Sequence, residues 1–207
     1  MRSKDTDAIV QETRELVRDG AFELMLIGQD TTSYGDDVGT GLGQVSGGGH
    51  FRAGLPKLLK TVSDTMTEEA GMGWLRLMYA YPSNFTDEII DAFAELTEPG
   101  RLCKYLDIPL QHASDSVLTA MRRHVSADQQ RELMLKLRER IPGMAIRTTF
   151  ISGFPGETEA DHEQLLEFID EIGFDAVGVF RYSREPGTPA AKMEDDPNLA
   201  VPEEVKE

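Results

Sequence analysis

Apolar residues follow two alternating spacings along the chain, one typical of helices and one typical of short buried strands. In the segment 5–18, for example, Ile9, Leu16 and Val17 fall on one side of a helix, and the apolar run 24–27 follows it as a strand. The helices predicted in this way cover 5–18, 55–66, 86–96, 114–121, 126–140 and 158–172. The predicted strands cover 24–27, 74–79, 102–108, 144–151 and 176–182.

Polar residues and glycines mark the ends of these predicted helices. Thr86, Ser114 and Thr158 are expected to cap helix starts with their side chains. Ser126 with Gln129 has the spacing of a capping box. The boundaries therefore rest on end signals as well as on apolar spacing.

Five strands that alternate with helices predict βαβ units, a parallel sheet and right-handed crossovers. The fold class is therefore α/β, and five strands are too few for a closed eight-stranded barrel. A partial TIM-type (β/α) barrel fits better, with a doubly wound sheet as the alternative. The chain begins on a helix that should follow a strand, so we expect the first strand of the barrel to be missing.

Two segments interrupt the pattern. The segment 35–54 holds eight glycines and is predicted to be a flexible insertion after the first strand. The segment 183–207 is rich in proline and acids, and is predicted to be an exit linker toward an absent C-terminal domain. Its last residues, 202–207, have the pattern of a first helical turn. The predicted barrel domain is thus 1–182.

The net charge of −16 limits the partners of this segment. A nucleic-acid surface needs clustered Lys and Arg, so direct nucleic-acid binding is not expected. An acidic surface favours a basic protein partner, although acidity can also serve only solubility. No apolar run approaches the ~20 residues of a membrane span, and the start has no signal-peptide core. A cytoplasmic location without membrane contact is expected.

Polar or glycine-rich loops follow all five predicted strands, and in parallel α/β folds such loops lie on one rim. They cover 28–32, 81–84, 109–112, 152–157 and 181–184. Each has a structural interpretation as well: Gln29 and Asp30 can bond a turn, His112 can bond its own loop, and Glu157 can complement a helix dipole. Arg147, on a strand with a buried pattern, needs an anionic ligand or a carboxylate such as Asp107.

At these loops the chain resembles the radical S-adenosylmethionine methylthiotransferases. The matching segments are 26–35, 104–112, 147–158 and 182–191, in family order. The details resemble the RimO type, which modifies an aspartate of a small-subunit ribosomal protein. The sequences that carry this resemblance lie at 29–32, 79–83, 108–112 and 147–149. The tRNA-modifying MiaB type tends to have Gln-Ser-Gly at 111–113, where this chain has Gln-His-Ala.

The resemblance implies a partial barrel with a cysteine loop for a [4Fe–4S] cluster, whose fourth iron site chelates S-adenosylmethionine. It implies a deoxyadenosyl radical that attacks the target aspartate, a ribosomal protein as substrate, and flanking N-terminal and TRAM domains. It places Gln29 and Asp30 at the amino group of S-adenosylmethionine and Gln111 near its ribose. It also places Arg147, Gly153 and Phe154 along the wall, and Phe180 and Tyr182 at the adenine. No catalytic residue and no metal ligand is assigned within this chain.

One departure affects the mechanism. A cluster loop needs three thiolates, and the only cysteine is Cys103, which lies in a predicted strand where a core role is expected. We therefore expect an inactive fragment of a longer enzyme, whose cluster ligands lie elsewhere. The alternatives are a fragment of the MiaB type, or a non-catalytic module that has lost the cluster. A different β/α barrel with phosphate or aldol chemistry would need a strand-end lysine or a phosphate loop, and neither is visible.

Overall fold

The computed structural model describes residues 2–38, 42–44, 50–52 and 54–206. It divides into two compact units. The first unit holds Met1–Asp107 and Leu137–Ala145, and the second holds Ile108–Lys136 and Ile146–Glu207.

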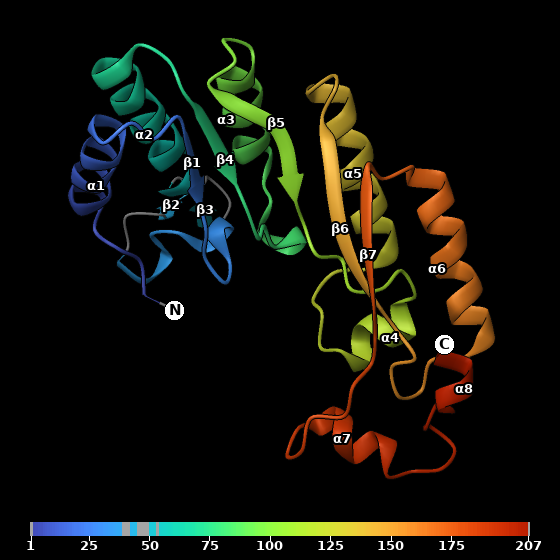
Figure 1. Cartoon of the computed structure of the whole chain (residues 1–207). Coiled ribbons are helices and arrows are strands. Elements are labelled where there is room, and N and C mark those ends of the chain that lie inside the picture. The colour runs from blue at the N-terminus through green and yellow to red at the C-terminus, as the bar shows by residue number, and fades with distance from the viewer. Residues whose placement is uncertain (1, 39–41, 45–49, 53, 207) are drawn as a thin grey trace. The chain divides into compact units, whose positions relative to one another are not determined.

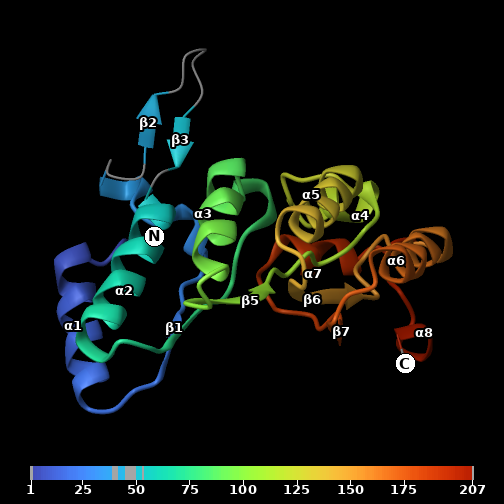
Figure 2. The same ribbon diagram turned by 90° about the horizontal axis from the view of Figure 1, so that it is seen from above.

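The first unit is a three-stranded parallel sheet with helices on one face (Figures 1 and 2). Its strands, in hydrogen-bonded order, are β1 (Glu23–Leu26), β4 (Trp74–Leu77) and β5 (Leu102–Asp107). Its helices are α1 (Thr6–Arg18), α2 (Gly54–Ala70) and α3 (Asp87–Thr97). Apolar helix residues at positions i, i+3 and i+4 pack against the strands. This contact removes apolar surface of both the helices and the strands from water, which stabilises the unit. The fully buried side chains include Leu59, Val62, Leu75, Leu77, Ile89, Ile90 and Phe93.

The second unit contains two parallel strands and the helices that follow. The strands are β6 (Ala145–Ser152) and β7 (Ala176–Arg181). The helices are α4 (Asp115–Ala120), α5 (Ala127–Arg140, whose last turn belongs to the first unit), α6 (Glu159–Ile172), α7 (Pro189–Glu194) and α8 (Glu203–Lys206). Phe150 packs edge-on against Phe168 and Phe174, with ring centroids 6.4 and 5.8 Å away. This aromatic cluster joins β6 to α6.

Helices cover one face of β6 and leave the other face open. Ile146, Thr148 and Phe150 are buried on the helix side, and Arg147 and Ile151 alternate with them and are half-buried on the other side. This alternation is the period of two expected of a strand. Helices on one face only, in each unit, agree with a segment of barrel wall and not with a doubly wound sheet, which is covered on both faces.

β7 is the outer strand of this unit and pairs only with β6 among the described strands. Its side chains are little covered: Val179 is 57% exposed and Phe180 is 61% exposed. An apolar strand of this kind is unusual on a protein surface.

The five predicted strands are confirmed to within two residues at each end, and so are all the helices except the second, which is longer than predicted. The capping box of Ser126 and Gln129 is confirmed by both hydrogen bonds, at 2.9 and 3.2 Å. The side-chain caps expected from Thr86 and Ser114 are wrong, because neither hydroxyl accepts a backbone N–H of its own helix start. Ser114 donates instead to Asp161 on α6.

The glycine-rich segment 35–54 is not irregular throughout. Its described residues include a single turn at Asp36–Val38 and an antiparallel pair of short strands, β2 (Leu42–Gln44) and β3 (His50–Arg52) (Figure 2). These residues carry secondary structure, since backbone pairing needs no side chains, and the flexibility of the insertion stays a prediction. The rest of the insertion lies outside the described residues.

The segment predicted to be a linker packs onto the second unit. Gly156 donates its backbone N–H to the carbonyl of Leu199 at 2.7 Å, and the side chain of Lys206 in α8 is 1% exposed. The helical turn predicted at 202–207 is confirmed for its described residues, Glu203–Lys206. The described residues up to 206 therefore do not form an extended linker, and a further domain beyond them stays a prediction. No described helix is long and apolar enough to cross a membrane.

Candidate functional site

The loop after β1 is held by the carboxylate of Asp30. One oxygen accepts hydrogen bonds from the backbone N–H of Thr32, at 3.0 Å, and from its hydroxyl. The other accepts from Ser33 at 2.6 Å and from the amide of Asn84, in the loop after β4, at 2.8 Å. Both oxygens of Asp30 are engaged in holding two loops together, which supports the structural interpretation of this residue. A direct contact with a cofactor stays a prediction.

Gln29, the residue before Asp30, has different surroundings. It is exposed and lines a cavity of about 510 Å³ in the first unit, together with Gly28, the start of the chain, and parts of α1 and α2. This volume falls in the range of small-molecule sites, about 300–1,000 Å³. Asp30 lines the same cavity, but Gln29 is the more exposed of the two and is not held by loop contacts of the kind that engage Asp30.

In the second unit, the strand register brings two predicted residues to the same side. Arg147 pairs with Ala176, and Ile151 pairs with Phe180, so Arg147, Ile151 and Phe180 share the face that helices do not cover. The guanidinium of Arg147 reaches close to Gly178, where an added Cβ would lie 4.0 Å from it. This face offers a cation and an aromatic ring. The predicted pairing of Arg147 with Asp107 joins residues of different units and stays a prediction, as does the common rim.

Gln111 continues the pairing at the edge of β6. Its N–H donates to the carbonyl of Thr149 at 2.9 Å, and its carbonyl accepts from Ile151 at 2.8 Å. Its φ is +75°, a region that non-glycine residues seldom occupy. Gln111 therefore forms a single β-bridge with Phe150 of β6, after which the strained backbone turns the chain away.

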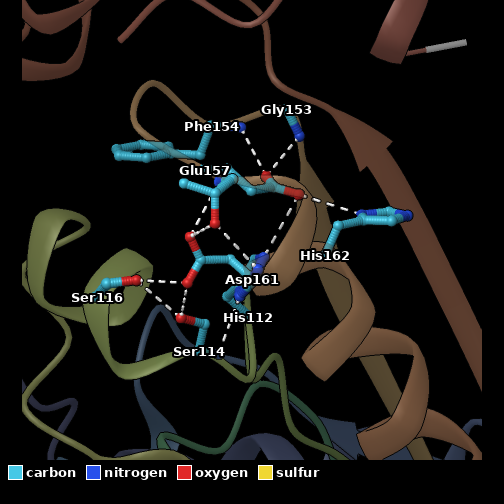
Figure 3. A network of polar contacts seen from close by, with 9 residues as sticks. His112, Ser114, Ser116, Gly153, Phe154, Glu157, Asp161 and His162 are labelled. Carbon is cyan, nitrogen blue, oxygen red and sulfur yellow. Dashed lines mark hydrogen bonds and ion pairs between the residues drawn. The ribbon is translucent and has the colours of Figure 1, made fainter.

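Glu157 is a buried carboxylate in the loop between β6 and α6 (Figure 3). One oxygen accepts the backbone N–H groups of Gly153, at 2.7 Å, and Phe154, at 3.0 Å. The other lies 3.2 Å from Nδ1 of His162 and 3.6 Å from Nε2 of the fully buried His112. Burial raises the pKa of Glu157, but the nearby His112 and the Phe154 amide outweigh it, so the pKa lies below its ordinary value. A charged carboxylate therefore fixes this loop.

The tautomer of His112 follows from its neighbours. Its Nδ1 accepts the backbone N–H of Ser114 at 3.0 Å. Nδ1 must then carry no proton, so the proton of the neutral ring is on Nε2, which faces Glu157. The expectation that His112 bonds its own loop is confirmed.

Asp161 fastens α6 to the start of α4 (Figure 3). It accepts from the hydroxyls of Ser114 and of Ser116, the latter at 2.7 Å, and forms a reciprocal capping box with Thr158. Burial raises the pKa of Asp161, but the hydrogen bonds from Ser114, Ser116 and Thr158 outweigh it, so the pKa lies well below its ordinary value. The charged form is strongly preferred in the folded state.

The substitution Asp161→Asn is expected to lower the free energy of unfolding by about 2–3 kcal/mol at neutral pH, since several hydrogen bonds to a charged acceptor are weakened. A carboxyl with a lowered pKa stabilises the fold above its unfolded-state pKa, about 3.9. That contribution disappears as the pH falls toward the folded-state value. Chemical denaturation at a series of pH values should therefore show the gap between wild type and variant closing below about pH 4.

The matched control is Asp170→Asn, at an exposed position on the same helix. It should change the stability by less than about 0.5 kcal/mol at every pH. A gap for Asp161→Asn that persists unchanged at acid pH would contradict the role given to the charge.

Gly153 and Lys206 are buried beside the half-buried Tyr182. A Cβ on Gly153 would lie 2.5 Å from Cγ of Lys206, so the lysine stem covers the glycine. The ammonium of Lys206 lies 5.3 Å from the ring centre of Tyr182, whose ring contacts Phe154 at 5.5 Å. The N–H of Gly153 is already donated to Glu157. The described contacts of Gly153 are therefore structural, and its role toward a cofactor stays a prediction.

The chain does not fit an iron–sulfur cluster. Cys103 is the only cysteine of the sequence and is half-buried in β5. Burial raises the pKa of its thiol, despite the opposing charge of Arg76. Within the described residues no group of three or more His, Cys, Asp or Glu could hold a metal ion. A cluster needs three thiolates on one loop, and this chain has one.

Sequence reasoning missed part of the second unit. Lys206 and Ser116 were not singled out, and neither was the pair of Asp161 with Ser114. The Thr158-x-x-Asp161 spacing carried a signal of the capping box that could have found Asp161. Lys206 has no such signal in the sequence, since its burial depends on contacts with a loop that is distant along the chain.

Comparison with known proteins defines the class. The family model of the radical SAM superfamily matches residues 1–169. The chain therefore belongs to the radical SAM superfamily. Two solved structures share the fold with a TM-score of 0.66 and 16% identity each. One is the radical S-adenosylmethionine methyltransferase TsrM from Kitasatospora setae, with 91% of this chain and 33% of that one covered. The other is coproporphyrinogen III oxidase (HemN) from Escherichia coli, with 97% and 42% covered.

Within this class, the chain is similar to proteins named ribosomal protein uS12 methylthiotransferase RimO. The protein from Heliobacterium modesticaldum is 48% identical over 206 residues, which is 100% of this chain and 40% of the relative. The protein from Geobacter sulfurreducens is 45% identical over 205 residues, which is 99% and 41%. The chain thus spans about 40% of the length of the curated relatives that it matches.

Proposed function

We propose that this chain is the radical S-adenosylmethionine core of an enzyme that methylthiolates an aspartate of the small-subunit ribosomal protein uS12. The observation that carries the proposal is the 48% identity to a uS12 methylthiotransferase along the whole chain. It is supported by the four loop segments that resemble the RimO type. A fragment of a tRNA methylthiotransferase, or a module without catalysis, is the alternative.

Each unit, taken by itself, offers residues that are proposed to contact S-adenosylmethionine. Gln29 lines the cavity of the first unit and is proposed to accept from the amino group of the ligand. In the second unit, the exposed ring of Phe180 is a surface on which an adenine can stack, and Arg147 on the same face supplies a positive charge. Gln111 and Phe154 line a further cavity, and Tyr182 supports Phe154. Bound S-adenosylmethionine would supply the radical and the methyl group.

The activity is proposed for a longer protein that includes this chain. A [4Fe–4S] cluster needs cysteines beyond Cys103, so the 207 residues alone are proposed to be inactive. The net charge of −16 supports a basic protein as substrate over a polyanionic tRNA. A cytoplasmic location is part of the same proposal, since the ribosomal substrate is found there.

A chimeric enzyme tests the proposal. The 207 residues would replace the matching segment of the Heliobacterium modesticaldum protein, which would supply the rest of the polypeptide. After anaerobic reconstitution the chimera is expected to add a methylthio group to uS12, visible by mass spectrometry of the aspartate-containing peptide. Gln29→Ala in the chimera should reduce the rate at least tenfold, while Gln11→Ala, at an exposed position on α1, should leave it unchanged.

Two outcomes would contradict the proposal. A chimera that methylthiolates adenosine in tRNA and leaves uS12 unmodified would favour the tRNA-modifying alternative. A chimera that carries its cluster, cleaves S-adenosylmethionine and modifies neither substrate would show that this segment does not support methylthio transfer.

A further inference from the structure

The first unit holds a cavity of about 360 Å³ at the amino ends of its strands. The last turns of α2 line it, together with the residues that lead into β1, β4 and β5. Figure 1 shows the end of α2 and the starts of β1 and β4 at the same end of the unit. Gln29, the candidate cofactor contact of this unit, follows the other end of β1. Chemistry in β/α barrels takes place at the carboxyl ends of the strands, so this cavity is a separate site.

Backbone hydrogen bonds join the segments that bound the cavity. The N–H of Trp74, at the start of β4, donates to the carbonyl of Phe22, just before β1, at 2.8 Å. The N–H of Leu75 donates to the carbonyl of Arg101, just before β5, at 2.9 Å. The wall is therefore built from paired backbone and is formed before any ligand binds.

A buried hydroxyl at this cavity lacks a partner. Ser63 of α2 lines the cavity and is 2% exposed, and its Oγ forms no hydrogen bond with any residue that the structure describes. The hydroxyl of Thr67, one turn along the helix, is already donated to the backbone carbonyl of Ser63 at 2.9 Å. A buried hydroxyl without a partner is unfavourable, and a ligand that bonds it removes this cost.

Two aromatic rings at the same cavity are only half covered. Phe22 and Trp74 pack edge to face with ring centroids 5.5 Å apart, and each is 49% exposed. A further ring can pack against such a pair in an offset or edge-to-face arrangement. Met66 and Met72 also line the cavity, and methionine sulfur makes favourable contacts with aromatic rings. The apolar wall thus favours an aromatic ring over an aliphatic chain.

The charges at the cavity favour a neutral ligand. Among the described residues that line it, none is Asp or Glu, and Arg101 is the single cation. The guanidinium of Arg101 donates to the carboxylate of Asp64 at 3.2 Å, so its charge is already balanced. A guanidinium held in this way still offers a planar surface of the kind that stacks on aromatic rings.

The volume limits the size of the ligand. A cavity of about 150 Å³ already holds benzene. The cavity of about 360 Å³ therefore has room for one ring or for two fused rings.

We propose that this cavity binds a small neutral aromatic molecule that carries one N–H or hydroxyl group, of the kind that indole and phenol represent. The ring packs on Phe22 and Trp74, and its polar group forms a hydrogen bond with the hydroxyl of Ser63. The site is separate from the residues proposed to contact S-adenosylmethionine, and it does not rest on the proposed function.

Nitrogen-15 NMR titration of the 207-residue chain tests the proposal. Trp74 is the one tryptophan of the sequence, so its indole N–H gives a single signal that reports on this cavity. The probes form two pairs of nearly equal shape: indole with indene, which lacks the N–H, and phenol with toluene, which lacks the hydroxyl. The Trp74 signal and the amides of Gly71 and Gly73 are expected to shift saturably with indole, with phenol or with both.

Ser63→Ala separates binding from folding. It is expected to weaken the polar probe at least fivefold and to leave its apolar counterpart equally or more tightly bound, because only the polar probe loses a hydrogen bond. The thermal midpoint should stay equal or rise, since the hydroxyl has no bond to lose within the described chain. A role of Ser63 in the fold alone would not give this combination.

The matched control is Thr61→Ala, on the same helix. Its hydroxyl is already bonded within the helix, to the carbonyl of Lys57 at 2.8 Å, and does not line the cavity. This change should leave the affinities of all four probes unchanged. Cyclohexanol, which keeps a hydroxyl on an aliphatic ring, should bind more weakly than phenol and so tests the preference for an aromatic ring.

Three results would overturn the proposal. They are the lack of a saturable Trp74 shift with both indole and phenol, an equal effect of Ser63→Ala on the two members of each pair, and cyclohexanol that binds as tightly as phenol. Binding of indole or phenol together with an inactive chimera would leave the cavity assigned and contradict only the proposed function.

Discussion

Anaerobic reconstitution of the 207-residue chain with iron and sulfide is expected to leave it without a [4Fe–4S] cluster. The physical reason is the number and state of its thiols. One cysteine cannot replace the three thiolates that hold such a cluster, and burial disfavours the thiolate of Cys103. The visible absorbance, the electron paramagnetic resonance spectrum and the iron content of the repurified protein measure the result.

The control for this experiment is Cys103→Ser, which should give the same low iron content as the wild type. The chimera with the Heliobacterium modesticaldum protein, treated in parallel, should bind a cluster and so show that the procedure works. A stoichiometric cluster on the 207-residue chain would mean that its ligands are not three cysteines.

Gly153→Ala is expected to lower the free energy of unfolding by about 2–4 kcal/mol, through two effects. The φ of +78° is unfavourable for alanine, and the new Cβ would overlap Cγ of Lys206 at 2.5 Å. Lys206 cannot move without disturbing its contacts with Glu203, at 2.7 Å, and Glu194, at 3.3 Å. Chemical denaturation of the two proteins measures the difference.

Gly187→Ala separates the two effects. Gly187 also has a positive φ, +86°, but nothing lies within 4 Å of an added Cβ. Its substitution should therefore cost only the strain, about 1 kcal/mol. Adding Lys206→Ala to Gly153→Ala should remove the overlap, so that the double variant loses less than the two single changes added together. Equal losses in Gly153→Ala and Gly187→Ala would show that the lysine stem does not press on the glycine.

The fold was accessible from the sequence because apolar spacing determines which surfaces can be buried. Ile89, Ile90 and Phe93 recur at helical spacing and are fully buried in α3. The exceptions depend on contacts between distant residues. Ser114 has the usual signature of a cap, but its hydroxyl is oriented by the bond that it donates to the carboxylate of Asp161 on a distant helix, and it accepts no N–H from its own helix start. A glycine-rich segment can still pair its backbone, as β2 and β3 do.

The site was accessible only in part. Gln29, Gln111 and Phe154 line cavities, and Arg147 and Phe180 share an uncovered face. Asp30 and Gly153 also line cavities, but their polar groups already hold loops together. Sequence position at a strand end places a residue on the rim but does not say whether its polar atoms are already bonded.

The outer strand β7 affects how the chain behaves in concentrated solution. Its outward backbone groups meet no described strand, and Val179 and Phe180 are mostly exposed, so two molecules that meet there can join edge to edge. The net charge of −16 opposes such encounters by repulsion between molecules. Salt shortens the range of that repulsion, to about 10 Å at 0.1 M, and leaves the apolar strand unchanged. The chain is therefore expected to resist association best at low ionic strength. A protein whose strand edges are covered does not depend on charge repulsion in this way.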